Sequence, residues 1–322
     1  MRPITVITIA TALMLGGGAV RAQAPESPHA NWMPPPESER CPSKWGAGDQ
    51  RGSGNHMSPD TVMRAARLMR TGETFELSYE LSGDMPLIGD RRFDVIVRHQ
   101  GRYPEEGERW VVTEQVTTEL GQVGTQLDAF AHNMAPGGVF YNCFRLQDIG
   151  TSSGMTALGV EKVGTLMTRG VLVDVAGLKG VEVLPETYAI TREDIQQALA
   201  RQNVTVQAGD AILVNTGWGK WYTEDKVRYL RSSPGLGIEA AEWLIEQDPM
   251  LLASDNCCIE VRPVGVGPLI HNFFLAVSGV HLIENVRLDE LAAARAYEFA
   301  FIVQPLKIRG GTGSTVSPTA IR

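Results

Sequence analysis

The sequence has fewer basic than acidic side chains. Its 322 residues include 29 Lys and Arg against 37 Asp and Glu, which gives a formal net charge of −8 at pH 7. Phosphate backbones and anionic lipid headgroups repel a chain with this charge balance. We therefore expect neither nucleic acid nor a negatively charged membrane surface as a partner.

Cysteine is also scarce, with four residues in the whole chain. That is too few for a disulfide framework at this length, and no pair has the Cys-x-x-Cys spacing of thiolate metal sites. Cys257 and Cys258 are adjacent, so a disulfide between them would be strained. A bond between Cys41 and Cys143 is compatible with the sequence but does not follow from it.

Long apolar runs are missing after the first twenty residues. Ile4–Val20 is largely apolar, follows Arg2 and precedes small residues around Ala22, as in a secretory signal peptide. We predict that residues 1–22 are this signal. A retained N-terminal anchor is the alternative, although the run is short for a bilayer span. Export would place the protein in the periplasm or outside the cell, in an oxidising compartment, with no membrane contact after cleavage.

The rest of the chain divides into an arm and one domain. Residues 23–43 are rich in proline and polar side chains, which is typical of an extended arm that can reach a neighbouring subunit. Residues 44–322 suffice for one large domain. From Val171 onward predicted strands and helices alternate, which indicates a mixed α/β class.

Local signals predict several elements. Ser58, followed by a proline, is a helix N-cap, and Gly72 is the expected helix end. Phe93–Arg98 and Arg109–Glu119 favour two paired strands. The glycine-rich segment Gly310–Ser314 lacks the lysine and the spacing of a P-loop, so we expect a structural turn there.

A polar stretch follows the second of these strands and contains Gln122, Gln126, Asp128 and His132. In extended backbone, residues two apart share a face, so Gln126 and Asp128 can converge. One helical turn after Asp128 would bring His132 back onto it, at the spacing i, i+4. The alternative is a solvated loop with a core histidine.

This stretch resembles the signature of the metal-dependent cyclase family, which includes bacterial kynurenine formamidase and isatin hydrolase. The signature is His-x-Gly-Thr-His-x-Asp-x-Pro-x-His. The matching positions are Gly124, Thr125, Asp128 and His132; Gln122 and Gln126 replace histidines, and Phe130 replaces the proline. Further blocks resemble the family in its order, namely Trp45-Gly46, Asp49–Gly52, Gly209–Trp218, Ser254–Asn256, His271, Glu284-Asn285 and Pro305–Ser314. The resemblance therefore extends from residue 45 to the end of the chain.

The resemblance implies a swivelling β/β/α fold, a single domain with a β-barrel-like sheet and flanking helices. It also implies that Asp128, His271 and Glu284 bind a divalent cation. Gln122 and Gln126 occupy the positions of two lost imidazole ligands and are weaker candidate ligands, because an amide oxygen is neutral and hard. We therefore expect one metal per chain, either Mn²⁺ or Zn²⁺, with Mg²⁺ as a further candidate.

The reaction implied by the resemblance is hydrolysis of a small amide, lactam or lactone. A water molecule activated by the metal would attack the carbonyl carbon, with His132 as general acid/base. A lyase or cyclase that works by proton transfer in the same pocket is one alternative, and a non-catalytic small-molecule-binding protein is another. Since the family forms dimers and tetramers, we expect a homodimer or homotetramer.

Overall fold

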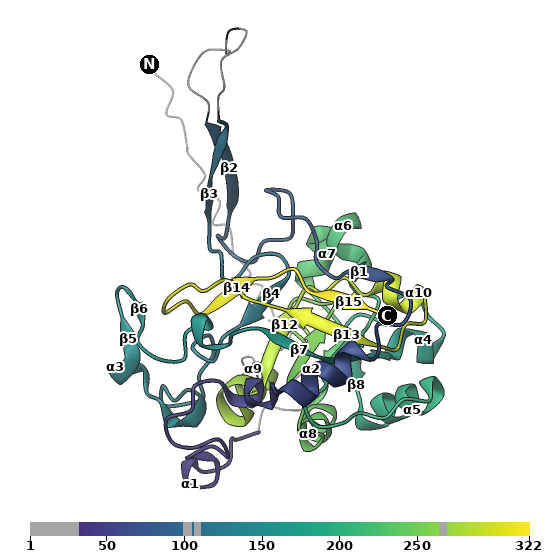
Figure 1. Cartoon of the computed structure of the whole chain (residues 1–322), viewed down its shortest axis with the longest axis horizontal. Coiled ribbons are helices and arrows are strands. Elements are labelled where there is room, and N and C mark those ends of the chain that lie inside the picture. Colours follow the sequence, from purple (N-terminus) through teal and green to yellow (C-terminus); the bar gives the residue numbers. More distant parts are fainter. Residues whose placement is uncertain (1–31, 99–104, 106–110, 264–268) are drawn as a thin grey trace, which may run out of the picture.

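A nine-stranded sheet organises the computed structural model, which describes residues 32–98, 105, 111–263 and 269–322. The strand order is β1-β15-β13-β7-β9-β11-β12-β4-β14. The strands are β1 (Thr74–Glu76), β4 (Gln126–Asp128), β7 (Leu166–Asp174), β9 (Ala211–Asn215), β11 (Leu251–Ser254), β12 (His281–Glu284), β13 (Glu298–Val303), β14 (Gly313–Thr315) and β15 (Thr319–Ile321). The central four, β7 to β12, are parallel, and the outer strands join them antiparallel. The sheet curls into a half-barrel (Figure 1).

Helices flank this sheet. They are α1 (Glu37–Arg40), α2 (Pro59–Ala66), α3 (Leu146–Ile149), α4 (Val175–Lys179), α5 (Arg192–Gln202), α6 (Lys220–Glu224), α7 (Lys226–Arg231), α8 (Ile238–Glu246), α9 (Leu269–His271) and α10 (Asp289–Ala293). A π-helix, η4 (Asn272–Ser278), continues directly from α9. None of the helices in the described part of the chain is both long and apolar enough to span a bilayer.

The sheet is buried on both faces, so its central strands carry continuous apolar runs. On β7, Val171 and Val173 pack with α4, α5 and α8 in one core. Leu172 points the other way, into a second core inside the half-barrel that also contains Leu291 of α10. The mixed α/β, single-domain architecture expected from the sequence is confirmed.

The helix N-cap predicted at Ser58 is present, and a second cap starts α5. The Ser58 hydroxyl accepts a hydrogen bond from the Thr61 N–H at the start of α2. Thr191 and Asp194 form a reciprocal capping box at the start of α5. The helix after Ser58 ends earlier than predicted, at Ala66, because residues 67–70 continue only as tight turns.

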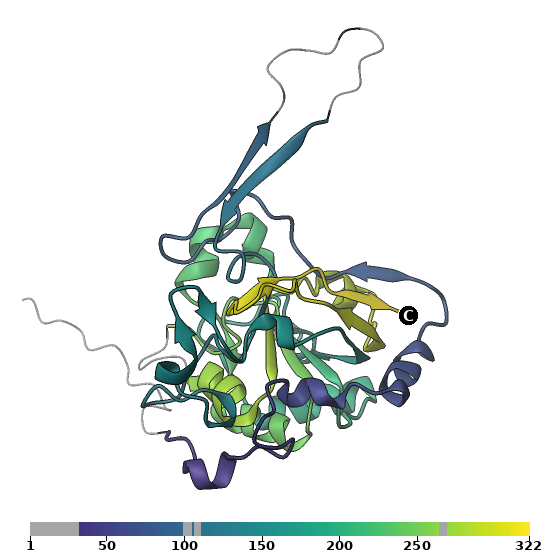
Figure 2. The ribbon, with the colours of Figure 1, turned by 60° about the vertical axis from the view of Figure 1, so that its left-hand side comes forward.

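The predicted pair of strands is a hairpin that projects from the body (Figure 2). Strand β2 (Phe93–Arg98) has the predicted bounds and pairs antiparallel with β3 (Thr113–Thr118). The described β3 is shorter than the predicted Arg109–Glu119, of which residues 109–110 lie outside the described ranges. Of the described residues of these two strands, only Phe93, at the base, is buried, and Val95, Val97 and Val116 are exposed.

The N-terminal arm differs from the extended arm that the sequence predicts. Of residues 23–43, only 32–43 are described, and the predicted signal peptide lies outside the described ranges. This part contains the short helix α1, and the Trp32 ring lies against that of Phe273 in η4. A disulfide joins Cys41 to Cys143, and Arg145 pairs with Glu37 at 2.8 Å. The described arm therefore packs on its own chain.

This disulfide should contribute strongly to stability, because it closes a loop across 102 residues. Replacing both Cys41 and Cys143 with Ser should lower the free energy of unfolding by about 2–5 kcal/mol. Urea unfolding followed by tryptophan fluorescence measures this difference. Reductant should reproduce the loss in the wild type and leave the double variant unchanged. Equal midpoints for both proteins without reductant would contradict the prediction.

Candidate metal centre

Strands β4 and β12 bring the polar signature residues together. In their antiparallel register Gln126 lies opposite Glu284, and Asp128 lies opposite Leu282. Residues 126, 128 and 284 therefore project from the same face of the sheet. Gly124 makes the turn into β4 with φ +66°, and a Cβ there would lie 2.3 Å from the Leu81 side chain. The predicted convergence of Gln126 and Asp128 is present.

His271 reaches this face from the junction of α9 and the π-helix η4. Its Nε2 lies 2.6 Å from Glu284 Oε1 and 3.7 Å from Asp128 Oδ2. One ligand atom from each of the three side chains lies within 4.8 Å of the others, and all three residues are buried. Single-turn π-helical segments often occur at functional sites, because the wider turn re-aims a side chain.

Glu260 is a component of the site that the sequence did not reveal. Its Oε2 accepts hydrogen bonds from the backbone N–H of His271 at 3.2 Å and from the ring Nδ1 at 2.9 Å. This contact fixes the imidazole so that Nε2 faces Asp128 and Glu284. Carboxylates commonly orient metal-binding histidines in this way. The only sequence signal is a lone acid between Ile259 and Val261, and Glu260 is buried.

Removing Glu260 should weaken cation binding without removing a ligand. We expect Glu260→Ala to lower Mn²⁺ affinity roughly 10- to 100-fold in calorimetric titration. Glu260→Gln should lose less, since its amide oxygen can still accept the Nδ1–H bond. The exposed Glu242→Gln on α8 is a matched control and should bind as the wild type does. Unchanged affinity in Glu260→Ala, with only a lower melting temperature, would contradict the orienting role.

The site carries more negative charge than its imidazole can balance. The pKa of Glu284 is raised to about 7, mainly by burial; the charge of His271 lowers it, and the charges of Asp128 and Glu260 add to the rise. Burial alone would lower the pKa of His271, but the flanking Glu260 and Glu284 carboxylates hold it well above its usual value. Asp128 Oδ2 is buried and has no hydrogen-bond partner among the described residues. An unsatisfied buried carboxylate oxygen beside an imidazole fits a divalent cation.

The two glutamines form a hydrogen-bonded pair beside the carboxylates. Gln126 Nε2 donates to Glu284 Oε2 at 3.1 Å and to Gln122 Oε1 at 3.3 Å. Gln122 Nε2 donates to Asp128 Oδ1 at 3.3 Å. In this arrangement the amides face the carboxylates as donors. Their predicted role as additional metal ligands stays a prediction.

His132 lies at the edge of the cluster. Its Nε2 is 4.0 Å from Asp128 Oδ2, and the side chain is 24% exposed. The chain reaches this position through a tight turn in which the His132 N–H donates to Ala129 O, so the helical turn expected after Asp128 is wrong. Within this turn Phe130 is buried against the rings of Tyr141 and His281.

Other chemical motifs lie outside this cluster. A Gly-x-Ser-x-Gly pattern at Gly150–Gly154 forms the small hairpin of β5 (Gly150–Thr151) and β6 (Gly154–Met155), not the strand-to-helix elbow of serine hydrolases.

Cys257 and Cys258 are buried free thiols with their sulfurs 2.9 Å apart. Gly310 adopts φ +67°, and a Cβ there would lie 2.6 Å from Met155 O, which agrees with the predicted structural turn.

The protein is thus a mixed α/β protein built on a half-barrel sheet. Among its described residues it has one candidate metal centre, the buried carboxylate–imidazole cluster on one face of the sheet. Residues 75–261 match the model of the family described as "Putative cyclase", and the chain belongs to this family.

Solved structures support this assignment. A crystal structure described as that of a novel cyclase is 31% identical, with a TM-score of 0.81, and the match covers 90% of this chain and all of that one. Two more distant structures share the fold. Isatin hydrolase A from Labrenzia aggregata, bound to benzyl benzoate, is 21% identical with a TM-score of 0.56, over 77% of this chain and 93% of that one. A protein from Bacillus stearothermophilus described as a predicted metal-dependent hydrolase is 17% identical with a TM-score of 0.50, over 78% of this chain and 98% of that one.

No curated protein gives a significant match to the chain.

Proposed function

We propose that the protein is a metal-dependent hydrolase of a small amide, lactam or lactone. The observation that carries the proposal is the convergence of Asp128, His271 and Glu284. In this cluster Asp128 Oδ2 accepts no hydrogen bond from the described residues. The metal-dependent hydrolase and the isatin hydrolase among the structural relatives support the same chemistry.

Asp128, His271 and Glu284 would hold one divalent cation. One nitrogen and two carboxylates suit Mn²⁺ or Zn²⁺, and Mg²⁺ is a further candidate. Once bound, the ion would polarise the substrate carbonyl and lower the pKa of a water molecule. Glu260 would keep His271 in the tautomer whose Nε2 is free, and the amide groups of Gln122 and Gln126 would hold the two carboxylates in place.

His132 would move the proton. Its ring lies beside Asp128 but outside the three converging ligands, and it is partly exposed, so substrate can reach it. As general base it would accept a proton from the attacking water at a ring nitrogen. It would then return the proton to the leaving nitrogen or oxygen.

Hydrolysis in H₂¹⁸O tests the proposal. The Mn²⁺-loaded protein should be screened against small N-acyl amides, lactams and lactones, with products analysed by mass spectrometry. Hydrolysis incorporates one ¹⁸O atom from solvent into each product acid. Turnover without ¹⁸O incorporation would establish a lyase or cyclase instead. A ligand that raises the melting temperature but is never turned over would favour a binding protein.

We also propose that the protein is exported and works as a homodimer or homotetramer. The Cys41–Cys143 disulfide supports an oxidising compartment, either the periplasm or the cell exterior. The projecting β2–β3 hairpin supports self-association, because a two-stranded ribbon with exposed valines is marginally stable alone. Light scattering should give at least twice the mass of one chain, and a monomer mass would contradict the expected oligomer.

A further inference from the structure

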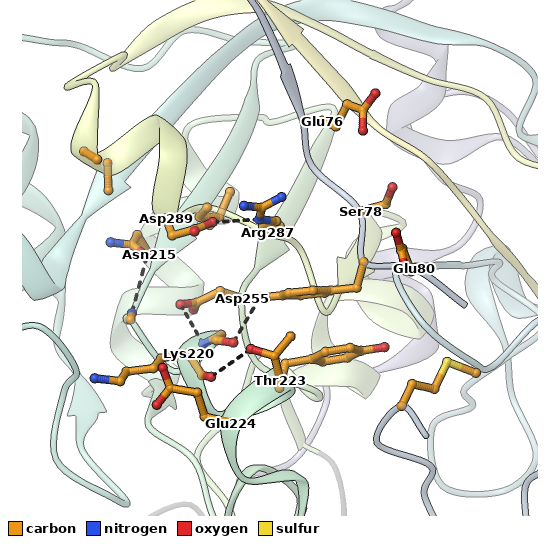
Figure 3. A pocket seen from close by; sticks show the side chains of 18 of the residues that line it. Glu76, Ser78, Glu80, Asn215, Lys220, Thr223, Glu224, Asp255, Arg287 and Asp289 are labelled. Carbon is orange, nitrogen blue, oxygen red and sulfur yellow. Dashed lines mark hydrogen bonds and ion pairs between the residues drawn. The ribbon is translucent and has the colours of Figure 1, made fainter. Parts of the chain in front are cut away.

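A cavity of about 940 Å³, separate from the candidate metal ligands, lies beyond the carboxyl ends of β9 and β11 (Figure 3). Asn215 at the end of β9 and Asp255 just after β11 contribute to its wall, and none of the three candidate metal ligands does. Ligands of open α/β sheets bind at such carboxyl ends. The volume falls in the range of small-molecule pockets.

The wall of this cavity is strongly acidic. Its carboxylate residues are Glu76, Glu80, Asp84, Glu182, Glu224, Asp255 and Asp289, and its basic residues are Lys220 and Arg287. Both bases are already paired with acids of the wall, Lys220 with Glu182 at 2.8 Å and Arg287 with Asp289 at 3.2 Å. The remaining acids have no ion pair in the part of the chain that the structure describes.

Two buried polar side chains, Tyr222 and Asp255, contribute to the wall of this cavity. Tyr222 is 5% exposed, and its hydroxyl has no hydrogen-bond partner among the described residues. Its ring stacks on that of Tyr79, with centroids 3.9 Å apart. Asp255 is 2% exposed, and its carboxylate accepts hydrogen bonds from the neutral groups of Thr216 and Gly219 but has no ion pair among the described residues. A buried carboxylate without a cation is costly, so a cationic ligand would be stabilising here.

The arrangement of the acids favours an extended cation over a metal ion. In the described chain, Asp128, His271 and Glu284 form the only group of three acidic, histidine or cysteine residues that could hold an ion. The acids of the cavity come from separate segments and do not converge in this way; Glu80, Asp255 and Glu224 are examples (Figure 3). Divalent ions need convergent oxygen ligands. Spaced carboxylates beside aromatic rings suit several spaced ammonium groups.

We propose that this cavity binds a small organic polycation of the polyamine class. Carboxylates such as Glu80 and Glu224 would pair with the terminal ammonium groups, and the Tyr79–Tyr222 stack would line the methylene chain. None of the three candidate metal ligands belongs to the wall of the cavity, so this proposal does not rest on the proposed hydrolase activity.

Calorimetric titration with spermidine, on the Mn²⁺-loaded full chain in 150 mM NaCl, tests the proposal. The wild type should bind one spermidine per chain. The double variant Glu80→Gln/Glu224→Gln changes two exposed side chains and should bind roughly five- to tenfold more weakly. The control Glu242→Gln/Glu246→Gln removes the same charge from the exposed face of α8 and should bind as the wild type does. The uncharged 1,8-octanediol should give no binding heat.

Three results would overturn the proposal. One is the absence of spermidine binding to the wild type. Another is an equal loss of affinity in the cavity variant and the α8 control, which would mean that only net charge matters. The third is displacement of spermidine by a second equivalent of Mn²⁺, which would make the cavity a metal site.

Discussion

Asp128→Ala is expected to abolish both metal binding and activity. Asp128 Oδ2 is buried, accepts no hydrogen bond from the described residues and faces His271 Nε2 at 3.7 Å. Without this carboxylate only His271 and Glu284 remain of the three ligands, and Glu284 already contacts His271 directly. Metal analysis should find less than about a tenth of an ion per chain, and turnover should fall to the uncatalysed level.

The isosteric Asp128→Asn separates loss of charge from loss of packing. It keeps the side-chain volume at a fully buried position and should also lose the metal. Because it relieves repulsion between Asp128 and Glu284, its metal-free form should melt no lower than the metal-free wild type. Mn²⁺ should raise the melting temperature of the wild type only. Metal retained at wild-type occupancy in Asp128→Asn would remove Asp128 from the ligand set.

Elements whose signal is local could be predicted from the sequence. The bounds of Phe93–Arg98 are correct, because a β-branched, apolar run with turn residues at both ends specifies a strand directly. The end of β1, at Glu76, has no such local signal. Beyond it the Tyr79 N–H donates to the Thr125 hydroxyl, a distant partner that no local pattern reveals.

The sequence predicted which residues form the candidate metal centre, but not how their side chains are arranged. The resemblance named Asp128, His271 and Glu284, and the structure brings them together. Glu260 was missed because its contact with His271 depends on how the loop between β11 and α9 folds. The π-helix after His271 was missed because apolar periodicity does not distinguish it from an α-helix. The Glu260 contact holds Nδ1 of His271, which leaves Nε2 facing Asp128 and Glu284.

His132→Ala is expected to lower kcat by roughly 10²- to 10⁴-fold, the usual contribution of a general acid/base. Metal content should stay near one ion per chain, because Asp128, His271 and Glu284 all remain. The His132 ring is partly exposed, and its side chain makes no hydrogen bond to the described residues. The fold should therefore tolerate its loss. Steady-state kinetics and metal analysis on the same preparation measure both quantities.

His56→Ala is the matched control for the loss of one imidazole. His56 lies beside Asp248, away from the cluster, and its removal should leave kcat unchanged. If His132→Ala lost the metal as Asp128→Ala does, His132 would be a ligand that replaces the imidazoles missing at Gln122 and Gln126. If it kept full activity, no proton would pass through His132. Only a fall in kcat with the metal retained agrees with a ring that stands 4.0 Å from Asp128 Oδ2, close enough to serve the reacting atoms without belonging to the ligand set.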